Sequence, residues 1–291
     1  MKVPRSAPLL IVGALFLFCS GVWSVVYAET PHSSGILTFA VLDIGQGDAL
    51  YIESPAGVQA VVDGGPDDSL LRALPGVMPA LDRTLDAIIE THPDADHIGG
   101  FSGLLNRYEV GVFISPGISK DTATAKKLEQ LVDEKKIPRV IARRGMSLDL
   151  GDGARLDILY PDRDVSTLPG SRANEGCIVA KLVYKNTSAF LACDAPALTE
   201  VRLLQIAPDE LESDILKVPH HGSKYSSTEA FIDAVHPAAA VISVGKNSYG
   251  HPTKQTLDRL AARDIEILRT DEKGTIVCKS DGAKFSCATE K

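Results

Sequence analysis

Four potential metal ligands lie close together in the stretch THPDADHIGG, residues 91–100. They are two histidines and two aspartates: His92, Asp94, Asp96 and His97. Burying two ionised carboxylates costs several kcal/mol for each charge unless a cation or hydrogen bonds compensate. A divalent cation provides that compensation, so the residue types and their spacing predict a metal site.

The elements on either side indicate how this cluster is held. The apolar residues 85–89 precede it and predict a buried strand, while residues 99–108 carry apolar side chains at helical spacing. The cluster therefore lies in the loop between a strand end and a helix N-terminus. On α/β scaffolds, such loops are where ligands bind and reactions take place.

Four further motifs accompany the cluster: LDIGQGDA at residues 42–49, VVDGG at 61–65, LACD at 191–194 and KVPHHGS at 217–223. Together the five motifs resemble the metallo-β-lactamase superfamily and its HxHxDH signature. Asp94 stands where that signature usually has its second histidine. In this respect the chain is similar to the metallo-β-lactamase-like domain of ComEC, the competence DNA-uptake proteins. The resemblance covers roughly residues 37–280.

The resemblance implies an α/β fold, the metallo-β-lactamase αββα sandwich, in which two β-sheets pack between outer helices. The predicted elements agree with this fold, because a strand-rich half is followed by a half in which strands and helices alternate. No linker, repeat or low-complexity tract interrupts the chain after its N-terminal segment. We therefore expect residues 29–291 to form a single hydrolase domain.

The resemblance also implies two divalent ions and a bridging water. It places Asp96, His97 and His221 on one ion, His92 and Asp94 on the other, and Asp194 on both. Asp63 would order the loops by hydrogen bonds without being a ligand; an ordinary turn-capping role is the alternative. Two neighbouring cations lower the pKa of a shared water and clamp the attacking and leaving oxygens in phosphoryl hydrolysis.

One expected ligand is missing, because no histidine occurs between Tyr108 and Asp214. Asn174 or Glu175 is the best replacement, and Asn174 is also a candidate substrate contact. Oxygen donors make a metal pocket harder, which favours Mn²⁺ over Zn²⁺ at that position, while Zn²⁺ stays an option in the other pocket.

The adjacent histidines of KVPHHGS leave an alternative open. His221 is the expected ligand because its position resembles the last histidine motif of the superfamily, and His220 would then face the substrate. The reverse assignment is the alternative. The expected catalytic residues are Asp96, Asp194, His220 and Lys224.

Residues after this motif are candidates for substrate binding. A helix N-terminus is predicted at Thr228, where an anion would meet free N–H groups together with Lys224 and Ser227. Ser227 has a second interpretation as the helix N-cap. His251 resembles another family position near the cleft, although a lone loop histidine is more often structural.

The N-terminal segment predicts export. Residues 7–28 are uncharged and follow Lys2 and Arg5, so residues 1–28 are either a cleaved signal peptide or an uncleaved single-span anchor. The hydrolase would then be extracellular, periplasmic or anchored at the outer face of the cytoplasmic membrane. Without this segment the net charge of −8 becomes −10. An acidic domain argues against tight non-specific binding to nucleic acid.

The cysteines predict one crosslink. Cys278 and Cys287 flank the turn signal at residues 281–282, so we expect a disulfide between them in an oxidising compartment. Two free thiols are the alternative. No CxxC pair is present, which argues against a structural zinc site.

Three functions follow from these features. The leading hypothesis is an exported, metal-dependent phosphodiesterase or nuclease with DNA among its candidate substrates. The second is hydrolysis of a lactone, β-lactam or other acyl compound, against which Asp94 counts. The third is a degenerate binding module without catalysis. Fold resemblance limits the inference to the chemistry of the site.

Overall fold

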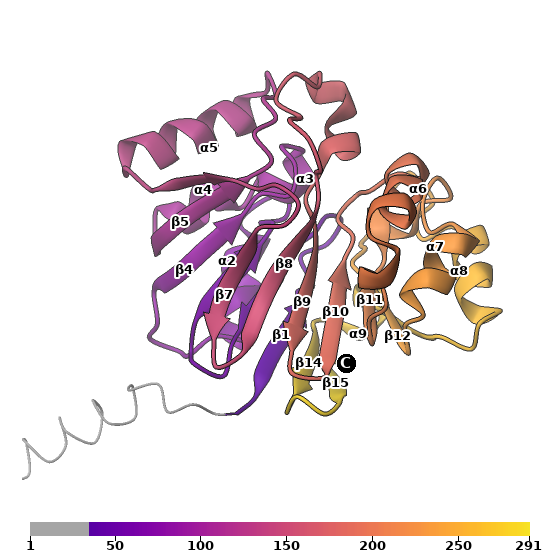
Figure 1. Ribbon diagram of the computed structural model, residues 1–291. Helices are drawn as coiled ribbons and strands as arrows, with labels where there is room; N and C mark the ends of the chain where they lie inside the picture. Colours follow the sequence, from indigo (N-terminus) through magenta and orange to yellow (C-terminus); the bar gives the residue numbers. More distant parts are fainter. Residues whose placement is uncertain (1–34) are drawn as a thin grey trace, which may run out of the picture.

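The computed structural model describes residues 35–291. The predicted export segment, residues 1–28, lies outside them. Within residues 35–291, no helix has the length and apolar character needed to cross a membrane. Two β-sheets form the inner layers of the molecule, and helices lie on the outside of each (Figure 1).

The first sheet has eight strands in the order β15-β14-β1-β2-β3-β4-β5-β6. Their bounds are β1 Leu37–Val41, β2 Leu50–Glu53, β3 Gln59–Val62, β4 Thr84–Ile89, β5 Glu109–Ser115, β6 Arg139–Ile141, β14 Ile276–Ser280 and β15 Phe285–Thr289. Strands β3 to β6 are parallel, and Val62 pairs with Ile89. Because parallel strands end at the same edge of a sheet, Asp63 and the ligand loop after β4 lie next to each other.

The second sheet has seven strands in the order β13-β12-β11-β10-β9-β8-β7. Their bounds are β7 Ser147–Gly151, β8 Ala154–Tyr160, β9 Val179–Tyr184, β10 Thr187–Leu191, β11 Ile215–Lys217, β12 Ala239–Ile242 and β13 Glu266–Arg269. Strands β10 to β13 are parallel, and Leu191 pairs with Lys217. This register brings the LACD and KVPHHGS motifs to one edge of the sheet.

Helices cover both sheets. They are α2 Ser69–Ala73, α3 Ala95–Ile98, α4 Phe101–Leu105 and α5 Ala123–Glu134 on the first sheet, and α6 Ala197–Ile206, α7 Glu229–Val235 and α8 Lys254–Ala261 on the second, with α9 Thr270–Lys273 after β13. Four short 3₁₀ helices complete the set: η1 Leu74–Gly76, η2 Gly170–Gly176, η3 Pro208–Glu210 and η4 Pro219–Gly222.

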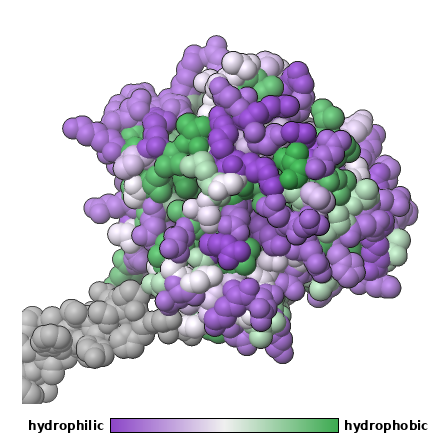
Figure 2. Space-filling model, in the orientation of Figure 1, coloured by the Kyte–Doolittle hydropathy of each residue, from purple (hydrophilic) through white to green (hydrophobic). Residues whose placement is uncertain are grey.

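Three hydrophobic clusters hold these layers together. One lies between the two sheets and includes Phe39 and Leu182, one from each sheet. A second packs α2, α4 and α5 on the first sheet, and a third packs α6, α7 and α8 on the second. Burying these apolar side chains leaves the face seen in Figure 2 mostly hydrophilic, with separate hydrophobic patches. The predicted αββα sandwich is confirmed.

The helix after the ligand loop begins earlier than the sequence predicts. Helix α3 starts at Ala95, so Asp96 and His97 lie in its first turn, and Gly99-Gly100 separates it from α4. A side chain at Gly99 would collide with the Pro66 carbonyl, and one at Gly100 with the Gly64 carbonyl. The two glycines therefore let the ligand helix pack directly against the loop that carries Asp63.

Candidate metal centre

Asp63 holds the ligand loop in place by hydrogen bonds. Its Oδ1 accepts a hydrogen bond from the Thr91 backbone N–H at 2.8 Å, and its Oδ2 accepts one from Thr91 Oγ1 at 2.7 Å. The same Oδ2 lies 2.8 Å from Nδ1 of His97. Asp63 is buried and has a left-handed φ of 59°, a conformation that aspartate tolerates better than most residues. These bonds leave Asp63 in the supporting role that the sequence predicts.

The hydrogen bonds of three histidines determine which ring nitrogen carries the proton when each ring is neutral. His97 donates from Nδ1 to Asp63, and His221 donates from Nδ1 to the Ser243 carbonyl at 2.9 Å. Nδ1 of His92 lies 3.0 Å from Thr91 Oγ1, which already donates to Asp63 and therefore accepts. In each neutral ring the lone pair is then on Nε2, as metal ligation requires.

These three Nε2 atoms are buried and have no hydrogen-bond partner among the described residues. Oδ1 of Asp194 is likewise buried and has no hydrogen-bond partner among these residues. Buried polar atoms are almost always satisfied, because an unsatisfied one costs about 1–3 kcal/mol. Four such atoms facing one another fit a divalent cation, so the residues present fit the metal site that the sequence predicts.

Asp194 lies between the histidines. Its Oδ2 is 3.4 Å from Nε2 of His97 and 3.7 Å from Nε2 of His220, and its Oδ1 is 3.7 Å from Nε2 of His221. Among residues 35–291, four groups of three potential ligands have ligand atoms within 4.8 Å of one another, and two of the groups consist of candidate ligands: Asp96, His97 and His221, and His92, His97 and Asp194. The other two groups include Asp48. The first set is the one expected to hold a single ion, and Asp194 belongs to the second set.

The carboxylates of the cluster stabilise positive charge among the ligands. Burial alone would lower the pKa of His221, but the carboxylates of Asp194 and Asp48 outweigh burial and raise it to about 10. Burial also opposes ionisation of Asp194, yet His221 and His97 hold its pKa well below the ordinary value. Without a metal, His221 and His97, whose pKa values are both raised, are therefore expected to carry protons in the place of cations, whereas burial lowers the pKa of His92.

A family model described as the metallo-beta-lactamase superfamily matches residues 42–246, which span the geometry described above. The chain belongs to the metallo-β-lactamase superfamily. It is 30% identical over 254 residues to ComE operon protein 3 of Bacillus subtilis, which covers 81% of this chain and 32% of that protein. It is 28% identical over 281 residues to competence protein ComA of Neisseria gonorrhoeae, covering 95% of this chain and 36% of that protein.

The chain thus spans about a third of the length of these curated relatives. They support the predicted ComEC-like type of metallo-β-lactamase domain. Among solved structures, a metallo hydrolase from Ignicoccus hospitalis superposes with a TM-score of 0.56 at 15% identity, covering 83% of this chain and 98% of that one. This likeness supports the fold alone.

Asp94, which replaces the usual second histidine of the family signature, has a partner that the sequence does not reveal. Its Oδ1 accepts a hydrogen bond from Nζ of Lys120 at 2.6 Å, and its Oδ2 lies 4.0 Å from Nε2 of His92. Asp94 does not belong to the compact ligand sets among residues 35–291. One carboxylate oxygen is thus engaged by a lysine, while the other faces His92.

The segment proposed to replace the missing histidine lies beside the ligand loop. The backbone N–H of Ile178 donates to the Thr91 carbonyl at 2.9 Å, and Cys177 is disulfide-bonded to Cys193, the neighbour of Asp194. Glu175 is engaged by Arg172, whose Nε lies 2.7 Å from Oε1 of Glu175, while Asn174 is half-buried. The sequence analysis missed this second disulfide, because cysteines 16 positions apart carry no local signal.

The predicted disulfide between Cys278 and Cys287 is confirmed. The two cysteines are directly opposite in the antiparallel pair formed by β14 and β15. Their pairing follows from a short hairpin, which the turn signal at residues 281–282 predicts.

The adjacent histidines differ in burial. His221 is buried, whereas the side chain of His220 is 32% exposed and lies at the rim near Asp194. Both adopt left-handed φ angles, 52° for His220 and 53° for His221, and only Nε2 of His221 is buried without a hydrogen-bond partner among the described residues. This geometry favours His221 as the ligand. His251 lies next to His220, with 5.6 Å between the ring centroids.

The prediction that an anion binds at the start of α7 is wrong. The backbone N–H groups of Ser227 and Thr228 donate to the two carboxylate oxygens of Glu200, the second bond measuring 2.8 Å. The helix N-cap is Thr228, whose side chain accepts from Phe231 N, and not Ser227. Ser227 is fully buried, so it is not open to substrate as predicted. Lys224 is exposed, with Nζ 5.1 Å from the centre of the Tyr225 ring.

The LDIGQGDA motif lies next to the ligand cluster and contacts it through Asp48. The Asp48 backbone N–H donates to the Asp96 carbonyl at 3.2 Å, and a side chain at Gly47 would collide with that carbonyl. The Asp48 carboxylate accepts from Lys217 Nζ at 2.7 Å and lies 3.4 Å from Nδ1 of His221. Lys217 was missed because lysine in a strand usually indicates solvent exposure.

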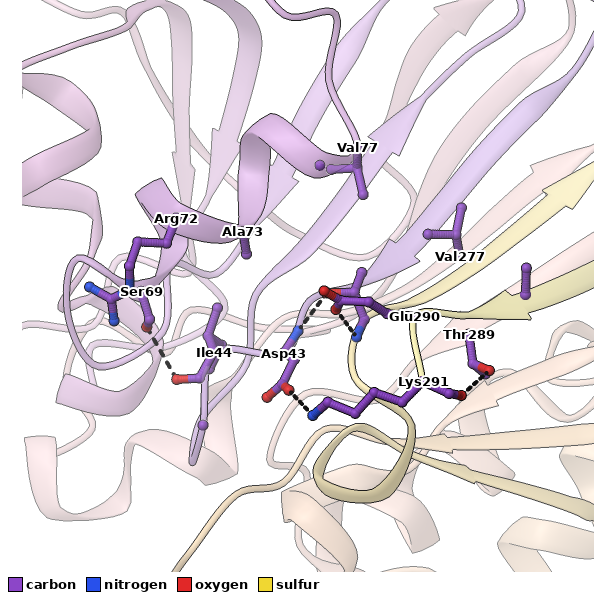
Figure 3. Close-up of a pocket in the computed structure, with 14 residues that line it drawn as sticks. Asp43, Ile44, Ser69, Arg72, Ala73, Val77, Val277, Thr289, Glu290 and Lys291 are labelled. Carbon is purple, nitrogen blue, oxygen red and sulfur yellow. Dashed lines mark hydrogen bonds and ion pairs between the residues drawn. The ribbon is translucent and has the colours of Figure 1, made fainter.

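A cavity of about 810 Å³ lies away from these ligands (Figure 3). It is lined by the loop at Asp43, by Arg72 and by the C-terminal residues, and Lys291 reaches Asp43 with 3.3 Å between Nζ and Oδ2. None of the candidate metal ligands lines it. The size of a cavity is therefore not what identifies the active site of this protein.

Proposed function

We propose that this protein is an exported, metal-dependent phosphodiesterase, a hydrolase that cleaves phosphodiesters, with nucleic acid among the candidate substrates. The observation that carries the proposal is the set of three buried, unpartnered Nε2 atoms around Asp194. When bound, two divalent ions, Mn²⁺ or Zn²⁺, would supply Lewis acidity and an activated water. The ions would be held by His92, Asp94, Asp96, His97, Asp194 and His221.

The donor set favours a phosphodiester over an acyl substrate. Asp94 replaces an imidazole, and Asn174 is the proposed replacement for another, so the centre is richer in oxygen donors than a histidine-dominated one. Two lysines could neutralise a phosphate: Lys120, whose Nζ lies 2.6 Å from Oδ1 of Asp94, and the exposed Lys224, three positions after His221 in the chain. The similarity to proteins named for competence points the same way.

The chain's own residues have distinct tasks in this scheme. Asp63 and Thr91 orient two histidines, while Asp48 and the Ser243 carbonyl orient His221. His220, half exposed above Asp194, is placed to hold or transfer a proton at Nε2 toward a leaving oxygen. Lys224 would bind a non-bridging phosphate oxygen.

Three outcomes of one assay separate the three candidate functions. Residues 29–291 are incubated with an activated phosphodiester, an activated ester and a β-lactam, each with Mn²⁺ or Zn²⁺. We expect turnover of the phosphodiester, more with Mn²⁺ than with Zn²⁺ alone. Turnover of the ester or β-lactam instead would support acyl hydrolysis, and metal binding without any turnover would indicate a binding module.

Asp194→Ala is the decisive variant in this assay. It should lose metal and activity together, because it removes a carboxylate that faces both ligand sets. Full metal content with normal turnover in Asp194→Ala would contradict the proposed centre. Lys224→Ala is the matched control, since it should keep its metal while its kcat/KM falls by roughly ten-fold or more, as for a lost charged hydrogen bond.

A further inference from the structure

Three aromatic rings form a row from the metal centre to the surface. His220 lies 3.7 Å from Asp194, measured from Nε2 to Oδ2. The ring centre of His251 is 5.6 Å from that of His220, and the ring centre of Tyr249 is 5.8 Å from that of His251. Tyr249 is 73% exposed, so the row ends in solvent. We call these three side chains the ring row.

The loop that carries Tyr249 is tied in place by one side chain. Oδ1 of Asn247 accepts hydrogen bonds from the backbone N–H groups of Tyr249 and His251, at 3.1 and 3.0 Å. Nδ2 of Asn247 donates to the carbonyls of Gly245 and His251, at 2.9 and 2.8 Å. The tyrosine is therefore presented by a loop whose backbone is already ordered, which reduces the entropy lost when a ligand binds.

The inner end of the ring row is held just as firmly. The His220 backbone N–H donates to the Cys193 carbonyl at 3.0 Å, next to Asp194. The Thr253 backbone N–H donates to the Gly222 carbonyl at 2.9 Å, which ties the tyrosine loop to the histidine turn. The distance from the metal centre to the exposed ring is thus set by backbone bonds at both ends.

We propose that the ring row is a subsite for a flat aromatic group attached to the scissile phosphate, and that this group is a nucleoside base. The inference rests on the proposed phosphodiesterase function. Every base has a π-face that can lie against Tyr249, so stacking there would tolerate different bases. The phosphate would meanwhile lie at the metal ligands, at the other end of the row.

The chemistry of the rim favours a nucleoside over a lipid. A fatty acyl chain needs a continuous apolar groove, whereas the neighbours of Tyr249 are polar: Lys246 and Ser248 are exposed, and Asn247 is half-buried. Within residues 35–291, Lys246 forms no ion pair with an acidic residue, in contrast to Lys254, whose Nζ lies 2.6 Å from Oδ1 of Asp258. An exposed lysine three positions before the exposed Tyr249 in the same loop suits an anion that carries an aromatic group.

The test uses two substrates with one leaving group. Thymidine 5′-(p-nitrophenyl) phosphate carries a base, and ethyl p-nitrophenyl phosphate carries none. The p-nitrophenyl ring of the leaving group is common to both substrates, so the difference between them reports the contact with the base. Tyr249→Ala should lower kcat/KM for the thymidine ester by on the order of ten-fold and leave the ethyl ester unchanged. Tyr249→Phe should behave like the wild type, because the ring and not the hydroxyl makes the contact.

Tyr225→Ala is the matched control. Tyr225 is 69% exposed, but its ring faces Lys224 and it is not part of the ring row. Its loss should keep the ratio of the two kcat/KM values at the wild-type level. An equal effect of Tyr249→Ala on both esters, or no effect on either, would overturn the subsite.

Binding keeps the two proposals separate. If the wild type hydrolyses neither ester, the phosphodiesterase proposal fails, and calorimetry then decides the subsite. Thymidine 5′-monophosphate should bind the wild type several-fold more tightly than ethyl phosphate, and Tyr249→Ala should remove that difference. Equal affinities of the wild type for the two phosphates would overturn the nucleoside subsite.

Discussion

Nζ of Lys217 lies 2.7 Å from Oδ2 of Asp48, and both side chains are buried beneath the candidate metal centre (exposures of 0% and 2%). Lys217 also donates to the Val218 carbonyl at 3.1 Å. The pair joins the first sheet to the second, since Asp48 precedes β2 and Lys217 ends β11. Oδ1 of Asp48 also lies 3.4 Å from Nδ1 of His221, so a change in the pair reaches a candidate metal ligand.

Breaking this ion pair from one side should destabilise the protein strongly. Lys217→Met leaves the Asp48 carboxylate buried without its partner, and we expect the free energy of unfolding to fall by about 3–5 kcal/mol. Urea unfolding of the metal-free protein measures this change. The double variant Asp48→Asn/Lys217→Met should recover much of the loss, because no buried charge is then left unpaired. Additive losses in the double variant would contradict the coupling.

Asp94 and Lys120 test whether the unusual aspartate is a ligand or only half of an ion pair. Asp94→Ala should lower the number of bound ions, whereas Lys120→Met should keep it, since Asp94 remains in place. Asp94→His should retain binding and shift preference toward Zn²⁺, because imidazole is the softer donor. Metal analysis after dialysis gives the result. Equal metal loss in Asp94→Ala and Lys120→Met would mean that the ion pair matters more than ligation.

The two disulfides should differ in their effect on the metal. Replacing Cys177 and Cys193 by serine opens a loop of 16 residues and should lower the free energy of unfolding by about 3 kcal/mol. It should also weaken metal binding, because Cys193 is next to Asp194. Cys278→Ser/Cys287→Ser is the matched control, with a loop of 9 residues, and should lose stability but not metal affinity.

A thiol assay checks that both bonds form. The denatured, unreduced protein should show no reactive thiol among these four cysteines. Four reactive thiols would show that neither disulfide forms in solution, and the stability prediction would then fail.

Metal affinity should fall as the pH falls. In the metal-free protein the pKa of His221 is raised to about 10 and that of His97 is also raised, so both carry protons at neutral pH. A metal must displace these protons, which lowers the apparent affinity by about ten-fold per pH unit for each proton. Chelator competition between pH 6.5 and 8.5, with proton release measured by calorimetry, tests this. An affinity independent of pH would contradict the raised pKa values.

The stability of the metal-free protein should fall as the pH rises, in contrast to its metal affinity, which should rise. Because the folded pKa of His221 exceeds its ordinary value of 6.5, its stabilising contribution is complete below pH 6.5 and is lost as the pH rises toward about 10. Metal-free protein should therefore unfold at lower urea concentration at pH 9 than at pH 6.5. Bound metal should remove this trend.

Local sequence patterns are sufficient to predict several parts of the site. His92, Asp96 and His97 lie in one short motif, and alternating strands and helices predict the layers around it. Asp194 and His221 follow strand ends, and parallel strands bring their ends to one edge, which is why two motifs far apart in the chain lie in one cluster. The Cys278–Cys287 bond was predictable because a hairpin makes its two cysteines neighbours.

Contacts between segments far apart in the chain could not be predicted from the sequence, because they depend on how the fold brings those segments together. Lys217 and Asp48 are separated by 169 positions, and Lys120 and Asp94 by 26, so no periodicity links them. Likewise, Glu200 of α6 accepts the N–H groups of Ser227 and Thr228 only because α6 packs beside α7. These N–H groups are therefore not free to bind the anion that the local pattern predicts there. Side-chain charges are satisfied by whatever the fold brings near them, and sequence spacing carries no information about that choice.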